Sequence, residues 1–323
     1  MGNIKVEPVE DYGLSQRATP KTQFQKVGVI GCGRQGSNII RMLSAAGMDV
    51  VFIETTLDNV KRGLKEIEDQ LEDMINRWGM TDSEKRSIMT RIHGSTQWNE
   101  LKGTDLVVEA VRSTDRDMRV KMRKDIFKKI ENHVSPQTII ATNSTTLAIT
   151  ELAADLKHKD RCLSLHFSTN SPEAHIIEVA RSIYTSDEVC GKIRKFAKLI
   201  KQEIISSKES AGLISVRLLS ALLNEACELY MQGISSIEDI DRTMRISLGL
   251  RFGPFEVADK IGIDRVLRWM DNLYSEFGDK KFKASPLIRR LVRAKQLGRA
   301  AGRGFYIYNG NGKRMNNRLF NKV

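Results

Sequence analysis

The sequence predicts an α/β protein in which a doubly wound parallel sheet is followed by an all-helical domain. Three observations predict it: a glycine-rich turn between a short apolar strand and a helix, alternating strand and helix patterns as far as about residue 207, and helical spacing alone thereafter. We expect a polar extension over residues 1–24, the sheet domain over 25–207 and the helical domain over 208–323.

The glycine-rich turn follows the first predicted strand, residues 26–30. Gly31, Gly33 and Gly36 match the pattern GxGxxG and lead into a helical stretch. The first glycine permits a tight turn, the second lets the backbone approach a pyrophosphate, and the third allows close packing of helix on strand. Glycines can also simply end a strand, but the order strand, turn, helix, strand favours a Rossmann-type dinucleotide site with the phosphates at the helix N-terminus.

An acidic residue ends the second predicted strand, residues 49–53. Glu54 lies 18 residues after Gly36, where a carboxylate would accept hydrogen bonds from ribose hydroxyls and repel a 2′-phosphate. The alternative is a solvated loop carboxylate. The glycine pattern and Glu54 together predict NAD as the cofactor.

Strand and helix patterns continue to alternate after Glu54. Helical spacing covers residues 57–78, 82–92, 118–132 and 147–156, and extended character covers residues 105–111, 138–141 and 161–167. Such alternation implies a parallel sheet with helices on both faces and ligand groups at the carboxyl ends of the strands. We therefore expect Glu54, Asn143 and His166 at one edge of the sheet.

A histidine and a glutamate in the stretch 163–181 are the candidates for proton transfer. His166 follows an apolar strand, and Glu178 lies twelve residues later inside a second apolar run. An imidazole can accept the proton that an alcohol loses when its hydride passes to NAD, and a carboxylate can orient that imidazole. His166 can also be a structural histidine and Glu178 an edge-strand carboxylate facing water, but the predicted architecture favours the catalytic pair.

Polar residues after the strand at 138–141 are a second candidate set. Asn143 is expected near the cofactor, and Thr145 and Thr146 could donate hydroxyl hydrogen bonds to substrate or cofactor. Capping of the following helix explains the hydroxyls equally well. His166 and His175 lack a third ligand nearby, so no metal site is expected.

Composition narrows the class of protein. The chain has 323 residues, 41% of them hydrophobic, and a net charge of +12, but no aromatic-interleaved basic patch that would favour nucleic acid. No apolar run approaches the length of a membrane span, and residues 1–21 lack the apolar segment of a secretory signal. Four scattered cysteines fit a reducing compartment, so we expect a cytoplasmic protein without nucleic-acid or membrane partners.

Several ordered motifs resemble the 3-hydroxyacyl-CoA dehydrogenase family over about residues 25–310. They include GVIGCGRQGSNI, DLVVEAV, ATNSTTLAITELA, LHFSTNSPEAHIIEVA and EDIDRTMRISLGLRFGPFEVADKIGID. The resemblance implies an NAD-binding domain, a helical domain used for homodimerisation, and oxidation of L-3-hydroxyacyl-CoA to 3-ketoacyl-CoA. It places the catalytic histidine at His166, its orienting glutamate at Glu178 and a hydroxyl donor at Thr145.

Two departures from the family pattern concern the substrate. Thr169 and Val216 stand where the resemblance expects asparagines near the reacting oxygen, with Ser168 and Asn170 as possible substitutes. Loss of such donors slows related sites by about 10² to 10³. The expected function is NAD-dependent oxidation of a short-chain L-3-hydroxyacyl-CoA, with a dehydrogenase of a free 3-hydroxy acid or a non-catalytic NAD sensor as alternatives.

Overall fold

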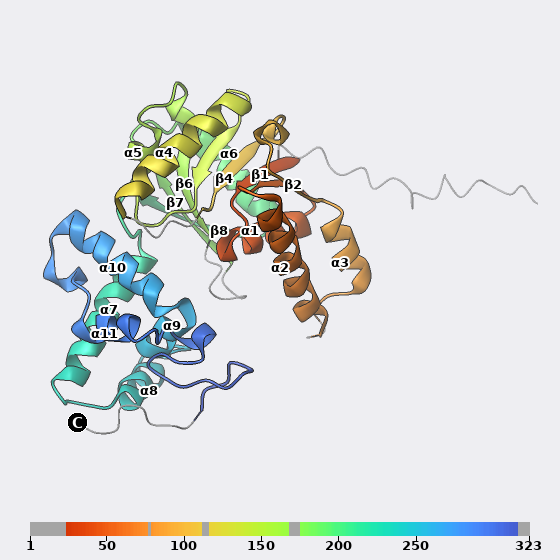
Figure 1. Cartoon of the computed structure of the whole chain (residues 1–323). Helices are drawn as coiled ribbons and strands as arrows, with labels where there is room; N and C mark the ends of the chain where they lie inside the picture. Colours follow the sequence, from red (N-terminus) through yellow and green to blue (C-terminus); the bar gives the residue numbers. More distant parts are fainter. Residues whose placement is uncertain (1–23, 77–78, 112–115, 168–174, 316–323) are drawn as a thin grey trace, which may run out of the picture.

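The computed structural model describes residues 24–76, 79–111, 116–167 and 175–315, without the side chains of residues 116–119. Eight strands of this part form one sheet in the order β3-β2-β1-β4-β5-β6-β7-β8 (Figure 1). The strands are β1 Lys26–Ile30, β2 Asp49–Ile53, β3 Ile92–Ser95, β4 Leu106–Glu109, β5 Ile139–Thr142, β6 Cys162–Phe167, β7 Ile176–Arg181 and β8 Glu203–Lys208. Neighbouring strands are parallel except β6 and β7, which are antiparallel.

Helices cover both faces of the sheet. One face packs against α1, α2, α3 and α6, and the other against α4 and α5, because apolar side chains from these helices form two separate buried clusters with the strands. The bounds are α1 Arg34–Ala45, α2 Leu57–Asn76, α3 Asp82–Met89, α4 Arg116–His133, α5 Ile149–Ala153 and α6 Asp187–Leu199. The central strands are buried on both faces, which accounts for their continuous apolar runs.

The helical domain has its own core. Its helices are α7 Ser215–Met231, α8 Ile237–Ser247, α9 Pro254–Ile261, α10 Ile263–Phe277 and α11 Pro286–Arg293. Apolar side chains from all five meet in one cluster that includes Leu223, Phe255 and Met270. Figure 1 shows this domain beside the sheet domain.

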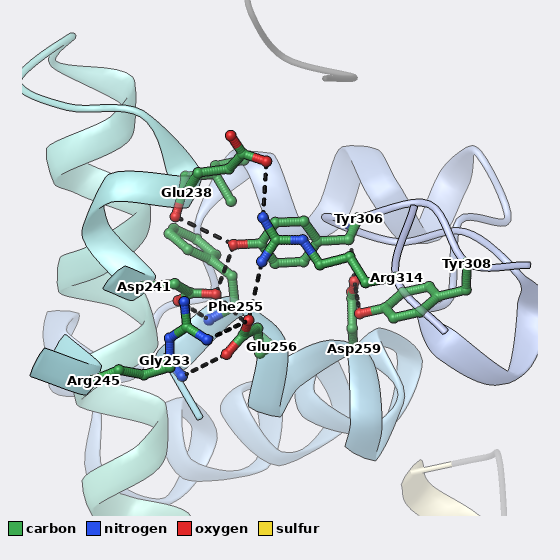
Figure 2. Close-up of polar contacts among 11 residues, drawn as sticks. Glu238, Asp241, Arg245, Gly253, Phe255, Glu256, Asp259, Tyr306, Tyr308 and Arg314 are labelled. Carbon is green, nitrogen blue, oxygen red and sulfur yellow. Dashed lines mark hydrogen bonds and ion pairs between the residues drawn. The ribbon is translucent and has the colours of Figure 1, made fainter. Parts of the chain in front are cut away.

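Residues 298–314, the C-terminal strap, pack onto α8 and α9. The strap contains a short 3-10 turn and isolated antiparallel bridges, including Arg303 with Ile307 and Tyr308 with Arg314. Figure 2 shows its anchors: Tyr306 and Tyr308 donate hydroxyl hydrogen bonds to Asp241 at 2.8 Å and Asp259 at 3.0 Å. Two buried carboxylates therefore hold the strap against the helices.

The predicted fold class is confirmed, and three local features differ from expectation. The helix expected over residues 82–92 ends at Met89, because Ile92 starts the edge strand β3, whose polar residues hide its strand character. Strand β8 and helix α6 escaped notice, and β8 runs across the expected boundary at 207/208. The strap adds extended bridges to a domain expected to be all-helical. The domain limits themselves stay predictions.

Candidate active site

The glycine turn has the shape that a phosphate cradle needs. Gly31 adopts a φ of +91°, and a Cβ on Gly36 would lie 1.9 Å from the Gly31 carbonyl oxygen. A Cβ on Gly33 would meet nothing within 4 Å, and Gly33 lines a cavity that His166 also lines. Helix α1 begins here at Gly33, which has no side chain to cap it, so the positive end of the helix faces the turn. The turn fits a dinucleotide pyrophosphate.

Glu54 follows β2 and reaches back to this turn. Its Oε1 accepts a hydrogen bond from the Cys32 backbone N–H at 2.6 Å, and its own N–H donates to the Ser95 carbonyl. The carboxylate is thereby fixed beside the glycine turn at the end of β2. The predicted contact with a ribose remains a prediction.

His166 and Glu178 lie directly opposite each other on the antiparallel strands β6 and β7. Cross-strand neighbours have Cβ atoms about 4.5–5.5 Å apart, so a twelve-residue separation in sequence becomes contact distance. Both side chains are buried, at 6% and 7% exposure. Burial lowers the pKa of His166, although the charge of Glu178 and a hydrogen bond with the Asn143 backbone oppose the effect.

The carboxylate of Glu178 is held by the helical domain. It accepts hydrogen bonds from the backbone N–H groups of Ile214 at 3.1 Å and Ser215 at 3.3 Å, where α7 begins. The positive end of a helix stabilises such a charge. His166 Nδ1 is buried and has no hydrogen-bond partner in the described part of the chain. Glu178 thus joins the two domains as well as lying beside the histidine, and its orienting role stays a prediction.

Asn143, Thr145 and Thr146 follow β5 and line the same cavity as His166. The Asn143 side-chain oxygen accepts the Phe167 N–H at 3.0 Å, which fixes the end of β6 beside the histidine. Thr145 is 7% exposed, and its carbonyl accepts the Gly212 N–H. The expected gathering of these residues with His166 at the carboxyl edge of the sheet is therefore present.

A buried ion pair at the end of β4 lies in this cavity and was not anticipated. Glu109 Oε2 accepts hydrogen bonds from Arg123 Nε at 3.1 Å and Thr142 Oγ1 at 2.6 Å. Arg123 Nη2 donates to the Val111 carbonyl, whereas its Nη1 is buried without a partner among the described residues. A carboxylate ending a buried apolar strand was the sequence signal that could have found this pair, since such a group needs a partner.

Helix α10 supplies the wall of the cavity that faces the sheet. Arg265, Arg268, Trp269 and Asn272 line it, and Asn272 Nδ2 donates to Thr146 Oγ1 at 2.8 Å. Their spacing in the sequence places them on one helix face, a signal that was present but not used. The cavity has a volume of about 260 Å³ and lies between the two domains.

The structure brings together some of the predicted residues and separates others. One cavity is lined by His166, Asn143, Thr145 and Gly33. Its lining residues do not include Glu178, Glu54, Gly31 or Gly36. Val216, expected beside the substrate, is 2% exposed and packs in an apolar cluster with Leu273 and Phe282. Ser168, Thr169 and Asn170 lie outside the described residues.

The described residues contain no cluster of three metal-ligating side chains. All four cysteines are free, and three of them are buried. Over the described ranges, no helix combines the length and apolar character needed to cross a bilayer.

The chain resembles known proteins over most of its length. The model of the 3-hydroxyacyl-CoA dehydrogenase NAD binding domain matches residues 26–210, and the model of the C-terminal domain of that family matches residues 212–308. A 3-hydroxybutyryl-CoA dehydrogenase of Clostridioides difficile is 34% identical over 284 residues, which cover 88% of this chain and 99% of the relative.

Solved structures give the same result. The crystal structure of (S)-3-hydroxybutyryl-CoA dehydrogenase from Ralstonia eutropha has a TM-score of 0.79 at 34% identity, covering 88% of this chain and 99% of that one. FadB2 of M. tuberculosis has a TM-score of 0.84 at 28% identity, with the same coverage of both chains. With both domain models matched in order, this chain belongs to the 3-hydroxyacyl-CoA dehydrogenase family.

Proposed function

We propose that this protein interconverts short-chain L-3-hydroxyacyl-CoA and 3-ketoacyl-CoA with NAD as cofactor. The observation that carries the proposal is the shared cavity, in which the open backbone of Gly33 and the buried imidazole of His166 face one space. NAD, when bound, supplies the hydride acceptor. The family to which the chain belongs and the names of its relatives support the substrate class.

His166 accepts the proton of the substrate hydroxyl during oxidation. Its pKa is lowered by burial, so the neutral ring that this task requires prevails at physiological pH. As the imidazolium forms, the negative charge of Glu178 on the opposite strand stabilises it. Glu178 is therefore proposed as the orienting carboxylate.

The other predicted residues receive supporting roles. Thr145 and Asn143 present polar groups to the reacting end of the cavity. Gly31, Gly33 and Gly36 shape the turn for the pyrophosphate, and Glu54 is proposed to accept the ribose hydroxyls in place of the Cys32 N–H that it now binds.

Following NADH absorbance with acetoacetyl-CoA and with free acetoacetate tests the proposal. We expect turnover of the CoA ester and far slower turnover of the free acid. Turnover of only the free acid would contradict the CoA assignment. Tight NADH binding without turnover of any keto substrate would instead support the sensor alternative.

We also propose that the protein is a cytoplasmic homodimer that associates through its helical domain. Large apolar side chains are exposed there, among them Leu218 at 68%, Ile246 at 72% and Leu248 at 64%. Burying such side chains against a second copy would remove them from water. Light scattering of the purified protein tests this, with Leu218→Lys expected to yield monomers if the face is the interface.

A further inference from the structure

The last turn of α9 carries a lysine that lies over an aromatic ring. Lys260 Nζ is 4.7 Å from the centre of the Phe252 ring, and the guanidinium of Arg251 is 5.4 Å from the centre of the same ring. The face of an aromatic ring attracts each of these cations. One aromatic side chain therefore holds two positive charges near each other at the end of α9.

The strap adds a third positive charge to this helix end. Gly298 packs so closely on α9 that a Cβ there would lie 2.4 Å from the Asp259 carbonyl oxygen, and Arg299 is the next residue. Burial, followed by the charges of Arg251 and Arg299, lowers the pKa of Lys260, as expected where like charges lie close together. The end of a helix carries only about half a negative charge, so the helix dipole does not balance this group of cations.

The acidic residues closest to Lys260 along α9 are engaged elsewhere. Glu256 Oε1 pairs with two arginines, at 3.0 Å and 3.6 Å, and Asp259 accepts the three hydrogen bonds that anchor the strap. The strap itself, residues 298–314, has four basic residues and no acidic one. Within the described ranges, neither Lys260 nor Arg299 forms an ion pair with a carboxylate. A negative charge that balances them would have to come from a ligand.

The end of α9 lies beside the glycine turn of the other domain. Ile261, the residue after Lys260, accepts a hydrogen bond through its carbonyl oxygen from Arg34 Nη1 at 3.5 Å. Arg34 begins α1 and lines the cavity together with Gly33, at the turn that is assigned to the pyrophosphate. Both nucleotide ligands of the proposed reaction, NAD and the CoA ester, carry phosphate groups. A ligand in the cleft can therefore supply the missing negative charge.

We propose that Lys260 and Arg299 form a phosphate-binding subsite on the helical domain, which binds a phosphate group of one of the two nucleotide ligands. An ammonium and a guanidinium both donate charge-assisted hydrogen bonds to phosphate oxygens. The inference rests on the proposed function and adds a contact to it. The sheet domain would bind the nucleotide at the glycine turn, and the helical domain would bind a phosphate from the facing side.

The test measures binding without turnover. Fluorescence titration gives the affinity for NADH. Calorimetry on the NAD complex, which cannot reduce a ketone, gives the affinities for acetoacetyl-CoA and for acetoacetyl-pantetheine, which lacks every phosphate of CoA. In Lys260→Met we expect the affinity for NADH or for acetoacetyl-CoA to fall by about 3- to 10-fold, as for one partly exposed charged contact, and Lys260→Arg should restore most of the loss.

The ligand that loses affinity identifies the source of the phosphate. Its binding should also weaken less with added salt in Lys260→Met than in the wild type, because one ionic contact is gone. Arg299→Met should weaken the same ligand. Lys195→Met removes an equal charge from an exposed position on α6 and is the matched control, which should bind all three ligands as the wild type does.

Two results would overturn the subsite: affinities of Lys260→Met for NADH and acetoacetyl-CoA that equal those of Lys195→Met, or an equal loss for the pantetheine ester and the CoA ester. The second result would show a structural effect of the substitution. Weakened nucleotide binding in a protein that reduces no keto ester would contradict the proposed function and leave the subsite standing. Circular dichroism checks folding, and Lys260→Gln replaces Lys260→Met if the latter fails to fold.

Discussion

Two sets of buried polar groups in this protein differ in how completely they are paired. One set is the nitrogens of His166 and Arg123 in the cleft, the cavity between the two domains, and the other is the carboxylates of Asp241 and Asp259 under the strap, where Arg314 Nε is also buried without a partner among the described residues. In the cleft, His166 Nδ1 and Arg123 Nη1 are buried without a partner in the described structure. Under the strap, Asp241 accepts hydrogen bonds from two backbone N–H groups and one hydroxyl, and so does Asp259. In both clusters, burial away from water imposes a free-energy cost on any polar group that lacks a hydrogen-bond partner.

This difference in pairing indicates which buried groups serve catalysis and which stabilise the fold. A buried group without a partner costs free energy, so its retention in a cavity points to a ligand that completes it. A carboxylate with all its hydrogen bonds made within the chain is a structural anchor. We expect substitutions in the cleft to change rates with a small effect on stability, and substitutions under the strap to do the reverse.

The largest expected effect is on rate. His166→Ala should lower kcat by about 10² to 10⁴, because the substrate proton loses its acceptor, with NADH affinity within a few-fold of wild type. Stopped-flow NADH absorbance and fluorescence titration measure the two quantities. His158→Ala, at an exposed histidine, is the control. Activity within a few-fold of wild type would remove His166 from the role of base.

The corresponding effect under the strap is on stability. Asp259→Ala leaves the N–H groups of Phe305 and Tyr306 and the hydroxyl of Tyr308 without their acceptor, at about 3–5 kcal/mol in total. Thermal unfolding should show a Tm lower by about 10 °C. Asp187→Ala, whose side chain is 90% exposed, provides the comparison. A Tm equal to that of the control would show that the strap is not anchored by Asp259.

The two clusters also differ in how far sequence alone revealed them. The glycine turn, Glu54, His166 and Glu178 were found because each follows or interrupts a strong local pattern of strand and turn. The strap was missed because its structure comes from contacts across the sequence: Asp259 bonds to residues 46 and 47 positions away. The local periodicity of apolar residues does not indicate which distant residues pair with each other.

Of the two walls of the cleft, the sequence predicted only the one formed by the edge of the sheet. The sheet edge follows from parallel topology, which brings the strand ends together whatever the loops contain. The opposite wall depends on how α10 packs against the sheet domain, as in the hydrogen bond of Asn272 to Thr146, and a polar stripe on one helix does not identify what it faces. The antiparallel pairing of β6 and β7 likewise became visible only in the sheet register.

Acid should stabilise the strap over a limited range. Burial raises the pKa of Asp241 and of Asp259 to about 6, compared with about 3.9 in an unfolded chain. Between about pH 4 and 6 the folded state binds these protons more tightly, so this contribution to unfolding free energy is present at the low end and lost as pH rises through 6. It is on the order of 1–3 kcal/mol per carboxyl. Carboxyl-carbon NMR titration measures both groups, and midpoints near 4 would contradict the expectation.

The cleft should respond to pH in the opposite sense. Because burial lowers the pKa of His166, its ring stays neutral and able to accept a proton below the ordinary histidine value of about 6.5. Oxidation should therefore keep its rate as pH falls through 6.5 and decline only at lower pH. A pH profile of kcat/KM for oxidation measures this, and a midpoint at or above 7 would contradict it.

The smallest expected effect is a loss of stability, and it tests whether the hydroxyl donor and the backbone donors to Asp259 stabilise the strap independently. Tyr308→Phe removes the 3.0 Å hydroxyl contact but leaves the N–H groups of Phe305 and Tyr306 in place. The carboxylate then keeps two donors, so the loss should be about 1 kcal/mol, the net value of one hydrogen bond. Tyr184→Phe, at a tyrosine that is 37% exposed, is the control for loss of a hydroxyl.

Thermal unfolding of Tyr308→Phe, Asp259→Ala and the double variant decides the question. If the hydroxyl acts only through the carboxylate, the double variant should be no less stable than Asp259→Ala, because the contact is already lost. Additive losses would mean that the Tyr308 hydroxyl stabilises the strap through something other than its hydrogen bond to Asp259. In that case the pairing of Asp259 would rest on the backbone alone, and the contrast with the unpaired nitrogens of the cleft would weaken.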